Sequence, residues 1–141
     1  MIKGIKIVVL SLLMLCLQNT SMAQAQRDKI EELRASFLSK KMELSTAEAE
    51  KFWPVYNELQ DKLKALKRNL RLSYRNLPSN FTDKEAEELL ALENKTRAAE
   101  TELHKTYNEK IKSIIGAKKL VKLQIYEEEF KKEVINAIKE K

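Results

Sequence analysis

Residues 44–77 read LSTAEAEKFWPVYNELQDKLKALKRNLRLSYRNL, and this stretch decides the fold. From residue 52 onward its apolar positions recur at alternating steps of four and three residues, a repeat of about 3.5 residues. Such a repeat keeps one apolar face turned toward a neighbour, so it predicts a long helix packed lengthwise against a partner helix. The positions of this stripe are Phe52, Tyr56, Leu59, Leu63, Leu66, Leu70, Ser73 and Leu77.

The same stretch carries its own start signal. The hydroxyl of Ser45 can accept a hydrogen bond from the amide three residues on, and Glu48 can reach back to the Ser45 amide. Leu44 stands just outside, where an apolar residue often packs against the first turn. This arrangement is a capping box, so the helix is predicted to run from Thr46 to about Leu77.

Pro54 lies early in this helix and lacks a backbone donor. It predicts either a kink near Trp53 or a short first turn followed by a restart. Three further helices are predicted from the apolar spacing. Their limits come from a loop at residues 76–80, a second capping box at residues 82–85 and a break at Gly116. These are residues 27–42, 83–115 and 117–139.

The fold is therefore predicted to be all-α, with four helices of which two are long, forming a bent antiparallel hairpin. The stripe on the third helix is thinner than that on the second, with Thr96 and Ala99 at its middle. A long hairpin with a thin stripe leaves apolar surface uncovered, so we expect the chain to pair as a homodimer.

The first 23 residues have the three-part layout of a secretory signal. Lys3 and Lys6 precede an unbroken apolar run at residues 7–17, and a polar break then leads to small residues around Ala23, which a signal peptidase reads. The run has about 11 residues, whereas a bilayer-spanning helix needs about 20. We expect an exported soluble protein with one helical domain at residues 24–141; a buried or anchoring helix is the alternative interpretation.

Composition argues against several function classes. Cys16 lies inside the predicted signal, so the processed chain would hold no disulfide, thiolate metal site or cysteine nucleophile. The signal holds two of the 27 basic residues and none of the 21 acidic ones, which leaves 25 against 21 and a net charge of +4. The charges are interspersed, so no nucleic-acid partner is indicated. His104 is the only histidine and no phosphate-binding glycine loop occurs, so no enzyme, cofactor or metal site is expected.

Residues 44–48 (LSTAE) and 52–56 (FWPVY), behind an export signal, resemble the Spy/CpxP-like periplasmic proteins, which are named for a repeated L-T-x-x-Q motif. The similar branch is the one labelled sensor of ECF-type sigma factor, or periplasmic heavy-metal sensor. Ser45 and Glu48 replace the Thr and Gln of the first motif and keep its capping chemistry. Residues 115–119 (IGAKK) stand where the second motif belongs and depart from it.

The resemblance implies an all-helical fold, often paired into a concave dimer, and an envelope-stress role in the periplasm. The leading hypothesis is a chaperone-like protein that binds unfolded client polypeptides without ATP. The alternative is a regulatory sensor that holds a membrane signalling partner, such as an anti-sigma factor or a sensor kinase. A structural coiled-coil adaptor is a third class. It would need a fully apolar seam, and Ser73, Thr96 and Ala99 in the two stripes argue against one.

Phe52, Trp53 and Tyr56 form an aromatic cluster near the start of the predicted helix. This aromatic cluster and the basic residues that follow it are the candidate client-binding residues. A basic surface with exposed apolar patches suits weak binding to unfolded, often acidic chains. In the simpler interpretation the aromatic rings belong to the core and the charges are only solvated. Peripheral contact of the basic face with anionic lipid headgroups is also left open. The candidates are Phe52, Trp53, Tyr56, Lys64, Arg68, Arg71 and Arg75.

Overall fold

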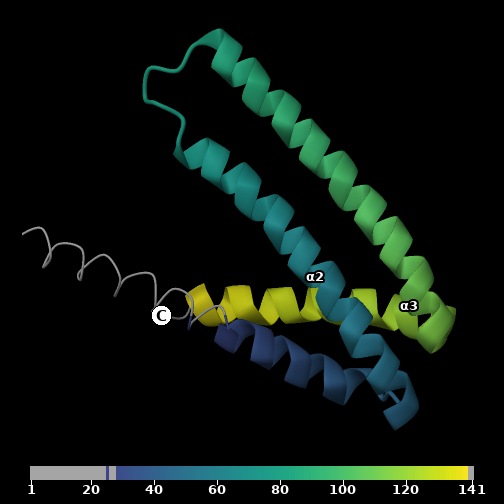
Figure 1. Cartoon of the computed structure of the whole chain (residues 1–141). Coiled ribbons are helices and arrows are strands. Elements are labelled where there is room, and N and C mark those ends of the chain that lie inside the picture. Colours follow the sequence, from purple (N-terminus) through teal and green to yellow (C-terminus); the bar gives the residue numbers. More distant parts are fainter. Residues whose placement is uncertain (1–24, 26–27, 140–141) are drawn as a thin grey trace, which may run out of the picture. The chain divides into compact units, whose positions relative to one another are not determined.

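The computed structural model describes residue 25 and residues 28–139, most of which are helical. No strand occurs in this part of the chain, so the all-α prediction is confirmed (Figure 1). The predicted signal at residues 1–23, with Cys16, lies outside the described residues. The helices are residues 28–42, α2 (Thr46–Arg75) and α3 (Asp83–Lys139).

The prediction of four helices is wrong for the described residues, which form three. The predicted break at Gly116 is a kink inside α3, where Gly116 has φ 78° and ψ 161° and helical geometry resumes at the next residue. Glycine has no Cβ and takes a positive φ at low cost. Gly116 alone therefore changes the direction of the α3 axis, and no loop separates residues 83–115 from residues 117–139.

α2 is one continuous helix that includes Pro54, so the chain does not stop and restart there. A single missing donor near the start of a long helix removes one of many backbone hydrogen bonds. The helix ends at Arg75, two residues before the predicted end, where the Asn76 amide donates to the Leu72 carbonyl at 3.0 Å.

The second predicted capping box also forms, at the start of α3. The Thr82 hydroxyl oxygen accepts the Glu85 N–H at 3.3 Å, and the Glu85 carboxylate accepts the Thr82 N–H at 2.7 Å. In the loop before it, the Phe81 N–H donates to the Pro78 carbonyl at 3.2 Å. The loop and the start of α3 are thus set by local hydrogen bonds, as their sequence predicts.

Contacts divide the chain into two compact units, and the last part of α3 belongs to the first of them. In that unit residues 28–42 pack with residues 126–139, and Leu38 and Phe130 are buried. The rings of Phe37 and Phe130 lie 5.6 Å apart, and the Lys41 Nζ lies 3.1 Å from a Glu129 carboxylate oxygen. The predicted single domain at residues 24–141 stays a prediction.

The second unit, Glu43–Ile125, is an antiparallel hairpin of α2 and the first part of α3 (Figure 1). The predicted stripe is buried along the first half of α2, whereas Leu66, Leu70 and Leu77 are only half-buried. The core is therefore thickest at the end away from the connecting loop. Its buried residues are Phe52, Tyr56, Leu59, Leu63, Leu89, Thr96, Tyr107, Ile111, Ile115, Leu120 and Leu123.

Candidate functional site

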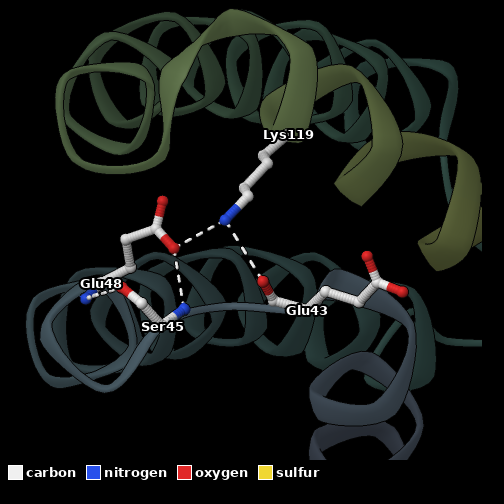
Figure 2. Close-up of polar contacts among 4 residues, drawn as sticks. All are labelled: Glu43, Ser45, Glu48 and Lys119. Carbon is white, nitrogen blue, oxygen red and sulfur yellow. Dashed lines mark hydrogen bonds and ion pairs between the residues drawn. The ribbon is translucent and has the colours of Figure 1, made fainter.

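The capping box at the start of α2 forms as predicted (Figure 2). Ser45 is extended, and its hydroxyl oxygen accepts the Glu48 N–H at 3.2 Å. The Glu48 carboxylate accepts the Ser45 N–H at 2.8 Å. Leu44 is half-buried beside them. The pair satisfies two backbone donors that would otherwise lack a partner at the helix start.

Lys119, on α3 just after the kink, joins this capping box (Figure 2). Its Nζ donates to the Glu48 carboxylate at 2.6 Å and to the Glu43 carbonyl at 3.2 Å. Glu43 has φ 48°, a left-handed conformation that is uncommon outside glycine. The hydrogen bonds from the Lys119 ammonium and the Ser45 amide hold the pKa of Glu48 below its ordinary value of 4.5. The start of α2 is thereby tied to α3 beside Gly116.

Lys119 is not among the residues that the sequence singles out. Lys119 lies 71 positions after Glu48, three residues beyond the kink at Gly116. The structure brings these two positions into direct contact. No signal in the sequence identifies this ion pair, because the two residues are far apart in the chain and meet only through the packing of α2 against α3.

The aromatic cluster at the start of α2 is largely a core element. Phe52 and Tyr56 are 0% and 3% exposed, so these two rings pack inside the hairpin, while Trp53 is half-buried. The ring centroids of Phe52 and Tyr56 lie 5.3 Å apart, and the Trp53 ring meets each of them edge-on, at 5.0 and 5.7 Å. Of the three candidates, Trp53 is the one with substantial contact to solvent.

The other four candidates, Lys64, Arg68, Arg71 and Arg75, are all exposed along the second half of α2. Their spacing of four, three and four residues places them on one side of the helix, and we call this set the basic row. From residue 62 to residue 82 the chain has six basic residues and no Asp or Glu. The structure therefore presents these four charges together on the surface.

Lys62 lies away from this row and belongs to a cluster around Tyr107. Its Nζ lies 2.9 Å from a Glu58 carboxylate oxygen and 5.2 Å from the centre of the Tyr107 ring, which the Lys110 Nζ also approaches, at 4.5 Å. Tyr107 is buried, and its hydroxyl has no partner at hydrogen-bonding geometry. It is still close enough, together with Lys62, to lower the pKa of Glu58. The sequence does not single out this cluster.

Between residues 28 and 139 no group of three or more His, Cys, Asp or Glu side chains is placed to hold a metal ion. His104 is exposed on α3. No helix in the described part of the chain is long and apolar enough to cross a membrane.

Comparison with known proteins finds no match to this chain among family models, curated proteins or solved structures. The resemblance to the Spy/CpxP-like proteins therefore stays a prediction from residues 44–59. What the structure adds is a capped and clamped helix start, a buried aromatic cluster and an exposed basic row on the same helix.

Proposed function

We propose that this chain is a non-enzymatic stress protein that binds unfolded client polypeptides without ATP, and that the basic row of α2 is its main contact surface. The observation that carries the proposal is the exposure of all four basic-row side chains along one side of a helix whose opposite side is packed in the hairpin. The half-buried ring of Trp53 lies nearer the start of the same helix and supplies apolar surface.

The physical basis is weak, adaptable binding. Arginine and lysine heads attract acidic segments over a distance, and their long apolar stems can cover hydrophobic segments of an unfolded chain. Neither contact requires a defined partner conformation. The burial of Phe52 and Tyr56 moves the proposed surface from the aromatic cluster to the basic row, with Trp53 as its only aromatic member from that cluster.

Family, compartment and assembly form part of the same proposal. We assign the chain to the Spy/CpxP-like periplasmic proteins, exported by its N-terminal signal, on the strength of residues 44–59 and the layout of the first 23 residues. A homodimer is supported by large apolar side chains that are about half exposed or more. These are Leu33, Leu90, Val121, Ile125, Ile135 and Ile138.

The test is light scattering from an aggregating client, without ATP, using the exported chain after its N-terminus has been mapped by mass spectrometry. The clients are reduced α-lactalbumin, which is acidic, and reduced lysozyme, which is basic. We expect the wild-type chain to suppress aggregation of α-lactalbumin more strongly than that of lysozyme. We expect Lys64→Gln/Arg68→Gln to lose most of this suppression, because it removes two charges from the middle of the surface.

The matched control is Lys105→Gln/Lys118→Gln, which removes the same charge from exposed positions on α3. Trp53→Ala tests the apolar contribution without opening the core, whereas Tyr56→Ala would leave a cavity. If the wild-type chain, at several-fold molar excess, suppresses the aggregation of neither client, the chaperone hypothesis is refuted. A single folded partner captured by the basic row would then identify the regulatory sensor.

A further inference from the structure

A second surface lies at the loop end of the α2/α3 hairpin, where basic and aromatic side chains are exposed together. Arg71, Tyr74 and Arg75 are three and four residues apart and so lie on one side of the last turns of α2. Phe81 lies in the loop that follows. Tyr74 is 48% exposed and Phe81 50% exposed. We call these four residues the loop-end patch.

The charge of α2 and the loop at this patch favours an anionic partner. No carboxylate occurs from residue 62 to residue 82. On α3, the Glu93 carboxylate accepts the Tyr74 hydroxyl at 2.8 Å and an Arg97 guanidinium N–H at 2.8 Å, so its charge is already matched. Glu85 caps its own helix through Thr82. Three exposed carboxylates on the first turns of α3 oppose the attraction, namely Asp83, Glu87 and Glu88.

The combination of arginines with exposed aromatic rings fits a lipid surface better than an acidic protein. Aromatic side chains favour the interface between headgroups and acyl chains, and basic side chains are drawn to anionic headgroups. A bilayer offers diffuse negative charge and a soft apolar layer, and it needs no pocket shaped to receive Phe81. A folded acidic protein would need such a pocket.

The packing of α2 also limits how deeply the chain can bind. Phe52, Tyr56, Leu59 and Leu63 are buried against α3, so the apolar face of α2 is not available to lie in a bilayer. Contact is confined to side chains at the loop end. Such contact is peripheral, reversible and sensitive to salt.

We propose that the loop-end patch docks this protein on an anionic lipid surface. The arginines contact headgroup phosphates, and the rings of Phe81 and Tyr74 enter the headgroup layer. The loop-end patch shares Arg71 and Arg75 with the basic row, so lipid and client compete for these two side chains, whereas Lys64 and Arg68 belong to the client surface alone.

The test is vesicle flotation of the exported chain, with vesicles of equal parts phosphatidylglycerol and phosphatidylcholine and with vesicles of phosphatidylcholine alone. We expect binding to the anionic vesicles only, with loss at high salt as the screening length falls. Arg71→Gln/Arg75→Gln should reduce partitioning by about fivefold for each arginine removed. Phe81→Ser should also weaken binding, and Lys105→Gln/Lys118→Gln should bind as the wild type does.

Circular dichroism of each variant confirms that it is folded. No binding to anionic vesicles, equal binding to both vesicle types, or equal loss in the Lys105/Lys118 control would overturn the proposal. Flotation that fails while poly-glutamate binds to the patch would identify an acidic polypeptide as the partner instead. The aggregation assay contains no lipid, so a chain that suppresses aggregation but does not float keeps the proposed function and loses only the lipid site.

Discussion

Replacing Gly116 with alanine tests whether the kink in α3 is held by the backbone. A Cβ at this position would meet no atom within 4 Å, so the new methyl group has room and packing does not oppose it. The cost is therefore the dihedral angles alone, φ 78° and ψ 161°. This region is almost restricted to glycine and costs another residue about 1–3 kcal/mol. Alanine also lowers the conformational entropy of the unfolded chain, which stabilises the folded state by about 0.4–1 kcal/mol.

We expect Gly116→Ala to lower the free energy of unfolding by about 1.3 kcal/mol, the middle of the net range of about 0–2.6 kcal/mol that these two contributions allow. With a urea slope of about 2 kcal/mol per molar, the midpoint should fall by about 0.6 M. Urea unfolding followed by far-UV circular dichroism measures this shift.

The matched control is Ala98→Gly, at an exposed helical position of α3, where the opposite substitution should also destabilise, by about 1 kcal/mol, through lost helix propensity. Glycine is thus preferred at position 116 and alanine at position 98. A Gly116→Ala variant that is as stable as the wild type, with a gain in helix signal, would refute the reasoning, because position 116 would then be an ordinary helical residue.

Two further perturbations test the core and the capping site. Phe52→Ala removes a fully buried ring, so we expect a loss of about 3–5 kcal/mol in the same urea assay, and a loss near that of an exposed substitution would contradict the core assignment. Glu48→Gln tests the ion pair to Lys119. Because the pKa of Glu48 is held below 4.5, its carboxylate stabilises the folded state above that pH, and this contribution is lost as the pH falls through the lowered pKa. The stability difference between wild type and Glu48→Gln should therefore exist at neutral pH and vanish in acid, and a difference that does not change with pH would rule out this role.

Local chemistry made much of this fold predictable. Both capping boxes involve residues three apart, and the stripe of α2 repeats every three or four residues, so each signal lies within one or two helical turns. Gly116 marked the position of the kink for the same reason. Whether Gly116 ends a helix or only kinks it depends on whether helical geometry resumes at the next residue. The residue types around Gly116 do not specify this, so the sequence predicted two helices where the structure has one kinked helix.

The contacts that the sequence did not predict join residues far apart in the chain. The Glu48–Lys119 ion pair spans 71 positions, and the Lys62–Tyr107 contact likewise joins α2 to α3. No local rule pairs such residues until the register of the two helices is known. The same limit applied to the aromatic cluster, because the sequence beside Pro54 is compatible both with rings buried in the core and with rings exposed for binding.

The distribution of burial and charge along α2 argues for where a partner binds. Near its start the helix is capped, tied to Lys119 and anchored by the buried rings of Phe52 and Tyr56, so few of its contacts there can be exchanged. Toward the loop the stripe residues Leu66 and Leu70 are only half-buried, and the basic row covers the outside. Elements with few buried apolar contacts open most easily. The less tightly packed half of α2 is thus the half that carries the cations, which is the physical reason to look for both proposed interactions there.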